Sequence, residues 1–330
     1  MEYTQLGRTG LKVSRLTLGT MNFGPQTDEA DSHTIMDAAL GAGINYFDTA
    51  NVYGQTAGKG RTEEILGSWF AQGGGRRDKV VLATKVYGNT APDGESIWPN
   101  QEKLSALHIR RAVEDSLRRL GTDHIDIYQF HHIDRNTPFE EIWQAIDVLV
   151  QQGKILYAGS SNFPGYKIAQ ANETAARHGR LGLVSEQCLY NLAERRAEME
   201  VIPAAQDYGV GIIPWSPLHS GLLGGVLKKA GAGSRSTGGR AAQELAKPEV
   251  RARIQAYEDL LDKHALEPGE VALAWLLTRP GVTSPIVGPR TADQLTSALR
   301  AVDLELSQEL LDALDEIFPG PGPSPEAFAW

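Results

Sequence analysis

Residues 125–160 read IDIYQFHHIDRNTPFEEIWQAIDVLVQQGKILYAGS and contain the unit that repeats along the chain. IDIYQF (125–130) and ILYAGS (155–160) are apolar runs of strand length, as expected for parallel strands that are buried on both faces. Between them, PFEEIWQAIDVLVQQG (138–153) has apolar residues at helical spacing and ends at a glycine. The stretch therefore predicts a strand, a covering helix and a second, parallel strand.

The same alternation extends over most of the chain. Strand-like runs occur at RLTLG (15–19), INYFD (44–48), VVLATK (80–85), IDIYQF (125–130), ILYAGS (155–160), LVSEQC (183–188), VGIIPW (210–215) and TSPIV (283–287). Amphipathic stretches lie between them at DSHTIMDAALGAG, TEEILGSWFAQ, LSALHIRRAVEDSLRRLG and YKIAQANETAARHG. Eight such repeats predict an α/β fold, a closed (β/α)8 TIM barrel. A doubly wound sheet is the alternative, although the turn GTMNFGPQTDE lacks the GxGxxG pattern.

The repeat predicts one domain over residues 1–330, with an N-terminal hairpin at Tyr3 to Val13. Two long loops, 86–101 and 218–247, follow predicted strands. Because the active site of a barrel forms at the carboxyl ends of its strands, these loops are expected to wall it. Their alternative role is that of plain flexible surface.

Residues 319–330 form a Pro/Gly-rich C-terminal tail, PGPGPSPEAFAW, that ends in Phe328 and Trp330. Large apolar side chains at a chain end either dock or lie exposed. One hypothesis is that the tail folds back near the carboxyl ends of the strands, or onto a neighbouring subunit, and lends an aromatic ring to the substrate pocket. The alternative is a frayed end.

Composition and charge exclude several classes of protein. The chain has 41% hydrophobic and 22% charged residues, and its 41 acidic and 32 basic residues give a formal net charge of −9. It has no basic run of the kind that binds nucleic acid or anionic lipid, and no apolar run near the about 20 residues of a membrane span. The single cysteine, Cys188, excludes an intramolecular disulfide, and the N-terminus MEYTQLGRTG has no signal-peptide pattern. We expect a cytoplasmic protein without nucleic-acid or membrane partners.

Polar residues recur at the ends of the predicted strands. Asp48 ends the second, Lys85 ends the third and His131 follows the fourth, while Tyr53 lies five residues beyond Asp48. Singly, each has an ordinary explanation, such as an aspartate that caps a turn or a solvated lysine. In a barrel, however, all strand ends face one pocket, so these four side chains are predicted to meet.

Such a group has a definite chemistry. A lysine ammonium beside a tyrosine favours the phenolate and lowers the pKa of the phenol, which makes it a better acid. Asp48 would hold Lys85 charged in a dry site, and His131 could bind the oxygen of a carbonyl substrate. The group therefore suits a reaction in which it protonates an oxygen while another molecule adds to the carbon that carries this oxygen. No metal is expected, since His131 and His132 cannot both face the pocket if the strand continues through them.

The motifs FDTANVYG, ATKVYG, DIYQFHHID, GSSNF, EQCLYN, PWSPLHSGLL and VGPRTADQL resemble those of the aldo-keto reductases, in their order and spacing. The resemblance runs from LGRTGLKVSRLTLGT to ALDEI, and it extends to the branch that includes the potassium-channel beta subunits. It implies a catalytic tetrad of Asp48, Tyr53, Lys85 and His131, with Tyr53 as the general acid. His131 is preferred to His132 because the family motif places the histidine three residues after a tyrosine, here Tyr128.

The resemblance also implies a nicotinamide cofactor held without a Rossmann motif. The residues implied to bind it are Ser160 or Ser161, Asn162 and Gln187 at the carboxamide, Trp215 on the ring, Ser216, Leu218, Ser220 and Leu222 at the pyrophosphate, and Gly288, Arg290 and Gln294 at the adenosine 2'-phosphate. Arg290 favours NADPH over NADH, because a guanidinium forks onto phosphate oxygens. One departure is Ala298, where the family usually has an asparagine that contacts adenine.

The leading function is therefore NADPH-dependent reduction of an aldehyde or ketone, with an aromatic substrate pocket suggested by Phe23, Tyr87, Trp98 and His132. One alternative is a binding or regulatory protein, as in the channel beta subunits, which depart from the tetrad at the histidine. Another is an aldolase with Lys85 as a Schiff-base nucleophile. Cys188, next to Gln187, is expected to be a packing residue, with a redox role as its alternative.

Overall fold

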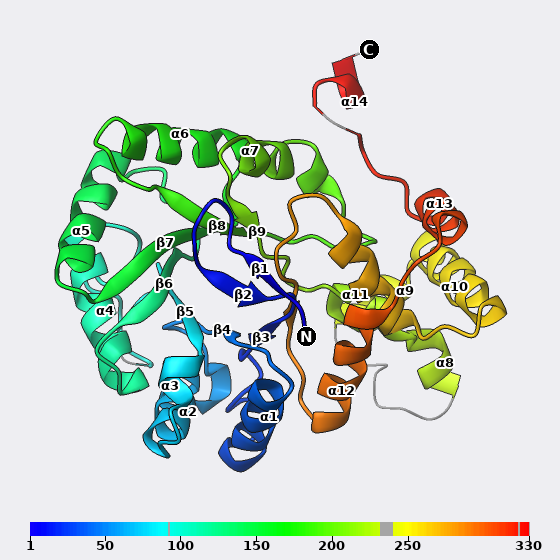
Figure 1. The fold of residues 1–330 in the computed structure, drawn as a ribbon, viewed down its shortest axis with the longest axis horizontal. Helices are drawn as coiled ribbons and strands as arrows, with labels where there is room; N and C mark the ends of the chain where they lie inside the picture. The colour runs from blue at the N-terminus through cyan, green and yellow to red at the C-terminus, as the bar shows by residue number, and fades with distance from the viewer. Residues whose placement is uncertain (92, 232–239, 323, 330) are drawn as a thin grey trace.

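A parallel sheet of eight strands lies at the centre of the molecule, in a computed structural model that describes residues 1–91, 93–231, 240–322 and 324–329 (Figure 1). Seven strands follow one another across the sheet in chain order, and the last strand pairs with the first. The strands are β3 (Thr17–Gly19), β4 (Tyr46–Asp48), β5 (Val81–Val86), β6 (Ile125–Phe130), β7 (Ile155–Ser161), β8 (Leu183–Gln187), β9 (Gly211–Ile212) and β10 (Ile286–Val287).

The sheet closes on itself between β9 and β10. The backbone N–H of Ile212 donates to the carbonyl oxygen of Gly281 at 3.0 Å, and that of Thr283 donates to the carbonyl oxygen of Ile212 at 2.8 Å. Further along, the N–H of Ile286 donates to the carbonyl oxygen of Pro214 at 2.9 Å. These bonds complete the ring, which confirms the predicted (β/α)8 barrel.

Helices cover the outside of the barrel, as the alternating sequence pattern predicts (Figure 1). Helix α4 shows why they form where they do: the Ser105 hydroxyl accepts the N–H of His108 at its start, and Gly121, with φ 61°, ends it. The principal helices are α1 (Glu29–Gly41), α2 (Arg61–Ala71), α4 (Ala106–Leu120), α5 (Phe139–Gln151), α6 (Gly165–Ala176), α7 (Val201–Asp207), α11 (Pro268–Thr278) and α12 (Ala292–Arg300).

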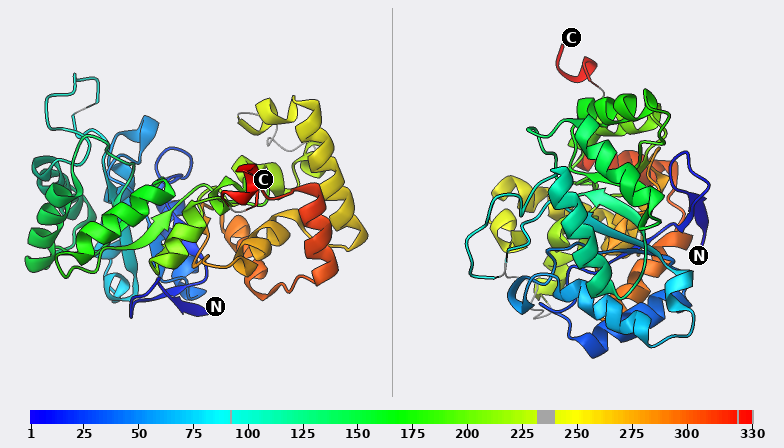
Figure 2. Two further views of the ribbon diagram at one scale, coloured as in Figure 1. Left: turned by 90° about the horizontal axis from the view of Figure 1, so that it is seen from above. Right: turned by 90° about the vertical axis from the view of Figure 1, so that its left-hand side faces the viewer.

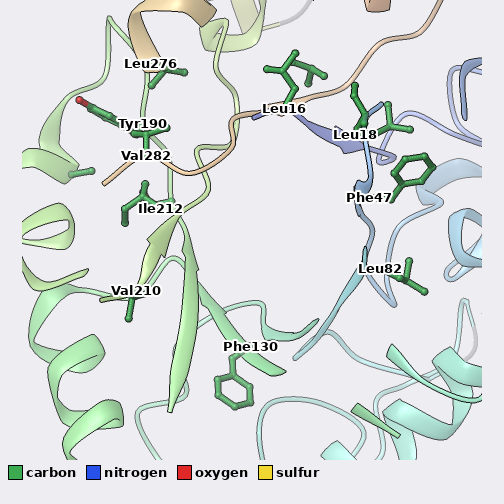
Figure 3. Packing of buried hydrophobic residues seen from close by; sticks show 14 of the residues in the cluster. Leu16, Leu18, Phe47, Leu82, Phe130, Tyr190, Val210, Ile212, Leu276 and Val282 are labelled. Atoms are coloured by element: carbon green, nitrogen blue, oxygen red, sulfur yellow. The ribbon is translucent and has the colours of Figure 1, made fainter. Parts of the chain in front are cut away.

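The core has two parts, one outside the strands and one inside them. Leu18, Phe47, Leu82 and Phe130 come from four adjoining strands and point outward toward the helices (Figure 3). A smaller apolar cluster fills the barrel and contains Leu6, Val13, Tyr46, Val81, Ala83, Ile127, Val184 and Ile213. Side chains alternate along a strand, so this arrangement fixes which residues of each strand face the barrel interior.

The predicted N-terminal hairpin is present and closes the amino-terminal end of the barrel. Strands β1 (Tyr3–Gln5) and β2 (Lys12–Ser14) pair antiparallel, and Leu6 and Val13 join the inner cluster. Figure 2 shows the hairpin at one end of the barrel and the loop that follows β5 at the other. The carboxyl ends of the strands are therefore left to the loops.

The loop predicted at 86–101 is confirmed, whereas the one predicted at 218–247 is wrong in part. The described residues between β5 and α4 form no regular element, but helices occupy much of 218–247 on either side of the undescribed segment 232–239. The remaining elements are α3 (Arg76–Lys79), η1 (Gln55–Ala57), η2 (Arg196–Glu198), η3 (His219–Gly224), α8 (Val226–Gly231), α9 (Arg240–Leu245), α10 (Pro248–Lys263), η5 (Ala301–Asp303), α13 (Gln308–Ile317) and α14 (Glu326–Ala329).

The described residues of the C-terminal tail do not line the barrel mouth in this chain. Beyond α13 it runs along the flank of the molecule, where the Ser324 N–H donates to the carbonyl oxygen of Met199 (Figure 1). Phe328 is 68% exposed, and Trp330 lies outside the described residues. Docking of Phe328 at the substrate pocket is therefore not seen within one chain. In the described residues, no helix has the length and apolar character needed to cross a membrane.

Candidate active site

An aspartate and a lysine form a buried ion pair at the carboxyl ends of β4 and β5. Because Phe47 and Leu82 point outward, alternation places Asp48 and Lys85 on the inner side. Lys85 Nζ lies 2.6 Å from Asp48 Oδ2 and donates to the carbonyl oxygen of Thr49 at 2.9 Å. Burial alone would lower the pKa of Lys85, but the Asp48 carboxylate and the Tyr53 hydroxyl together outweigh burial, and the pKa lies above its ordinary value. The lysine is therefore held as an ammonium.

Tyr53 reaches this ion pair from the loop that follows β4. Lys85 Nζ lies 3.2 Å from the Tyr53 hydroxyl oxygen and 4.8 Å from the centre of its ring. Burial raises the pKa of Tyr53, and the charge of Lys85 offsets only part of that increase because Asp48 acts in the opposite sense. The expectation of a lowered pKa is therefore wrong for the protein alone. The phenol stays protonated at neutral pH.

The two histidines after β6 stack side by side, which differs from the expectation. The strand ends at Phe130, so alternation no longer separates them, and the rings of His131 and His132 lie 4.8 Å apart with an angle of 4° between their planes. His131 also meets Tyr53 edge to face at 5.9 Å between ring centres. Burial, followed by the charges of Lys85 and His132, lowers the pKa of His131 to about 2. Its imidazole is therefore neutral.

A second polar group lies beside the histidines, on the loops after β7 and β9. Trp215 Nε1 donates to Asn162 Oδ1 at 3.0 Å, and Asn162 Nδ2 donates to the carbonyl oxygen of His131 at 3.3 Å. Asn162 has a left-handed backbone, with φ 58°, which is costly for a residue with a side chain. The structure therefore joins two of the residues predicted to bind the cofactor to one of the tetrad.

Strand register distinguishes the two candidate serines. Ser161 pairs with Gln187, and Ser160 pairs with Glu186. Gln187 reaches Asp48 inside the barrel, whereas the Ser160 hydroxyl donates to the buried Glu186 carboxyl group, whose pKa burial raises to about 8. Ser161 is therefore the serine on the side of the tetrad, and Ser160 is corrected to a residue of the outer face.

The candidate pyrophosphate residues lie in a loop with unusual backbone geometry. Ser216 and Ser220 have φ 56°, His219 has φ 47°, and the Ser220 N–H donates to the Ser216 hydroxyl oxygen at 3.1 Å. Leu218 is half-buried, and the side chain of Leu222 is 1% exposed and belongs to the outer core. A contact of Leu222 with the cofactor is thus possible only through its backbone.

The candidate 2'-phosphate residues surround the start of α12. Thr291 caps this helix, and Gln294 Oε1 accepts the backbone N–H of Arg290 at 2.8 Å. Gly288 holds the same loop through its carbonyl oxygen, which accepts from Asn22 Nδ2 at 2.8 Å. Within the described part of the chain, no carboxylate lies within salt-bridge distance of the exposed Arg290 guanidinium. Ala298, the departure from the family motif, is buried.

The four candidate substrate residues do not form one group. His132 and Tyr87 meet edge to face at 5.3 Å between ring centres, next to His131. Trp98 is 74% exposed on the loop after β5. Phe23 is fully buried in the outer core, so it cannot line an open pocket, and its prediction is corrected.

A protein-family model described as the "Aldo/keto reductase family" matches residues 15–318. The chain belongs to the aldo/keto reductase family. This confirms the resemblance that the motifs carry. The match covers every strand of the barrel and all residues of the tetrad.

Three relatives illustrate the range of this family. An "Uncharacterized oxidoreductase YrpG" of Bacillus subtilis is 52% identical over the whole of both chains. A "Versiconal hemiacetal acetate reductase" of Aspergillus parasiticus is 35% identical over 96% of each chain. A "Probable voltage-gated potassium channel subunit beta" of Arabidopsis thaliana is 31% identical over 99% of this chain and all of its own. The predicted branch of the aldo/keto reductases is thereby confirmed.

Sequence reasoning missed one residue of this aldo/keto reductase site, Gln129. It is fully buried on β6, level with Lys85, and its Nε2 donates to Asp48 Oδ1 at 2.9 Å. The signal was available, because Gln129 is a polar residue in an apolar strand, two positions after Ile127, so that both face the same side of the sheet. Cys188, in contrast, is buried, and burial raises the pKa of its thiol well above the ordinary value. The structure thus favours packing over a redox role for Cys188.

Proposed function

We propose that the protein reduces an aldehyde or ketone to the alcohol, with NADPH as the reductant and Tyr53 as the general acid. The observation that carries this proposal is the 3.2 Å contact between Lys85 Nζ and the Tyr53 hydroxyl, with Asp48 on the far side of the lysine. NADPH supplies the hydride that the carbonyl carbon receives. The carbonyl oxygen then needs one proton, and Tyr53 is the protonated hydroxyl that faces the site.

Each member of the tetrad has a separate task in this reaction. Tyr53 gives its proton to the substrate oxygen, and the ammonium of Lys85 stabilises the phenolate that remains. Asp48 keeps that ammonium charged and in place. His131, as a neutral imidazole, donates a hydrogen bond to the same substrate oxygen and orients it. A charged imidazole beside Lys85 would be repelled, which agrees with its lowered pKa.

The loop after β9 suits a pyrophosphate. Leu218 has right-handed bridge geometry, with φ −99° and ψ 17°, and it is followed by left-handed backbone at His219, Ser220 and Gly221. The N–H groups of His219 and Gly221 donate to the carbonyl oxygens of Ser216 and Leu218, and that of Ser220 donates to the Ser216 hydroxyl, so these bonds fix the backbone of the loop. Residues with side chains rarely adopt left-handed backbone, and they cluster at ligand sites when they do. The loop is therefore a fitting cradle for the cofactor phosphates.

Arg290 supports NADPH as the cofactor. Its exposed guanidinium stands beside the capped start of α12, where the helix dipole also favours an anion. Its charge, which has no carboxylate partner among the residues that the structure describes, is available for the 2'-phosphate that distinguishes NADPH from NADH.

The aldolase alternative is disfavoured by the electrostatics of Lys85. A Schiff-base lysine needs a lowered pKa so that its amine is unprotonated. The Asp48 carboxylate instead raises the pKa of Lys85. A regulatory role, suggested by the potassium-channel relative, does not require the tetrad, whereas this chain retains all four residues.

The test compares the parent protein with Tyr53→Phe. NADPH oxidation is followed by absorbance over a panel of aldehydes and ketones, and NADPH binding is followed by fluorescence. We expect kcat to fall by about 100-fold or more while NADPH affinity is kept, since general acid catalysis contributes at least that factor. The control is Tyr128→Phe, because the buried Tyr128 hydroxyl has no hydrogen-bond partner among the described residues. Equal activity in both variants would show that Tyr53 is not the acid.

A further inference from the structure

We propose that Gln129 is a positioning residue of the active site, which orients both the Asp48 carboxylate and the Gln187 amide. This inference rests on the proposed function and adds to it a residue outside the tetrad. It starts from the way in which the two Asp48 oxygens are used. Oδ2 faces Lys85 at 2.6 Å, whereas Oδ1 accepts Gln129 Nε2 at 2.9 Å and Gln187 Nε2 at 2.8 Å.

These two glutamines are the side chains that hold the second oxygen of a carboxylate that is only 2% exposed. Within the described residues, no backbone N–H donates to either oxygen of the Asp48 carboxylate. A buried charge is costly unless hydrogen bonds satisfy its remaining lone pairs. Gln129 and Gln187 therefore fix the rotation of the carboxylate that directs Oδ2 at Lys85.

The barrel provides a place for Gln129. It lies on β6 between Lys85 of β5 and Gly159 of β7, in register with both. A methyl group at position 159 would lie 3.2 Å from Gln129 Cγ and 2.4 Å from the Ser185 hydroxyl oxygen. The absence of a side chain at Gly159 thus leaves the space that the Gln129 side chain crosses on its way to Asp48.

The same contacts decide which way the Gln187 amide faces. Its nitrogen points at two acceptors, Asp48 Oδ1 at 2.8 Å and Gln129 Oε1 at 3.5 Å. The Gln187 oxygen is consequently turned away from them, and no donor from the described residues bonds to it. An amide oxygen held in this way accepts the NH₂ group of a carboxamide, which is what a nicotinamide ring presents. Gln129 therefore links the tetrad to the cofactor side of the pocket.

The variants for the test are Gln129→Met and Gln129→Glu, with Tyr128→Phe as the control on the same strand. Gln129→Met keeps the side-chain length and removes both amide contacts. We expect kcat to fall by about tenfold to 100-fold, because hydrogen bonds to charged groups have contributions of that size. The dissociation constant for NADPH should rise several-fold, because Gln187 loses one of its two acceptors.

The pH profile separates positioning from a general loss of stability. In Gln129→Glu, the new carboxyl group shares a site with Asp48 and keeps its proton at neutral pH, which lets it donate to Asp48. Its kcat should then fall as the pH rises and that proton is lost, whereas the parent and Tyr128→Phe should show no such loss.

A readout without substrate keeps this test independent of the proposed function. Thermal unfolding of the protein without cofactor is measured from about pH 4 to pH 8. Gln129→Met should be less stable than both the parent and Tyr128→Phe over this range, because the buried Asp48 carboxylate loses one of its donors. If the parent reduces no carbonyl compound, the proposed function fails, while this unfolding curve still decides the role of Gln129. Gln129 has no positioning role if its variants match Tyr128→Phe in NADPH affinity, pH profile and thermal stability.

Discussion

Replacing Asp48 by asparagine should destabilise the protein through the lysine that it leaves behind. The side chains of Asp48 and Lys85 are 3% and 0% exposed, and 2.6 Å separates the charged atoms. The new amide would face Lys85 with its NH₂ group or turn that group toward Gln129 and Gln187, which are also donors. Breaking a buried pair by removing one partner costs about 3 to 5 kcal/mol. That is a large part of the free energy of unfolding of a typical protein, which is about 5 to 15 kcal/mol.

The pH dependence of this loss has a predictable sign. In the parent, the folded-state pKa of Lys85 is raised. The contribution of Lys85 to stability is therefore complete at neutral pH and is lost as the pH rises through the folded-state pKa. In Asp48→Asn, burial is opposed only by the contact with Tyr53, and the pKa of Lys85 should fall below that of the unfolded chain. The unfolded state then binds more protons, so the stability of the variant rises with pH. The deficit relative to the parent should therefore shrink in alkaline solution.

Urea unfolding at about pH 7 and pH 9.5 measures both effects. The control is Asp262→Asn, which removes the same charge from a Lys–Asp pair, with Lys228, whose side chains are 46% and 48% exposed. Exposed ion pairs contribute little to stability, so the free energy of unfolding of this variant should be close to that of the parent. An Asp48→Asn deficit that is no larger than that of Asp262→Asn, or that is equal at both pH values, would refute the reasoning.

Three further predictions concern the cofactor, a buried carboxyl group and the tail. Arg290→Ala should weaken the binding of NADPH by about 1.5 to 3 kcal/mol and that of NADH much less, as measured by fluorescence titration with each cofactor. An equal loss of affinity for both cofactors would show that Arg290 does not bind the 2'-phosphate. Burial raises the pKa of Glu186 to about 8, so the folded state keeps a proton that the unfolded chain releases, and stability should fall between about pH 5 and 8 by up to about 1.4 kcal/mol per pH unit. Glu186→Gln should remove that slope in urea unfolding, and a slope that persists would assign it to another group. Deleting residues 320–330 should leave KM for a small and a bulky aldehyde unchanged, because Phe328 is 68% exposed on α14; a rise in KM for the bulky aldehyde alone would restore the pocket-wall hypothesis.

The barrel could be predicted because it depends on local patterns. Runs such as IDIYQF and VVLATK are apolar at nearly every position, and only strands covered on both faces need that pattern. The strands of the structure begin and end within two residues of most of these runs. The secondary structure of region 218–247 is harder to predict from sequence, because its short helices bury few residues and its glycines are typical of a loop.

The tetrad was predictable for a related reason: strand ends of a barrel converge, whatever their separation along the chain. That rule and the resemblance are enough to predict that the side chains of Asp48, Lys85 and the two histidines meet. The pKa of Tyr53 did not follow from it, since the size of the burial effect depends on the walls of the pocket. The prediction that Phe23 lines the substrate pocket was wrong for a similar reason. Nothing in the local sequence indicates that its ring packs into the outer core.

The sequence by itself determined the order of strands and helices, the family, and the residue types that meet at the carboxyl ends of the strands. These follow from periodicities and motifs, which are local. Only the tertiary structure decided that Ser161 rather than Ser160 faces the tetrad, that His131 and His132 stack, and that Gln129 reaches Asp48. Each of these depends on the register between neighbouring strands or on the residue at which a strand ends. A shift of one residue turns a side chain to the opposite face, and packing across the whole barrel fixes that shift.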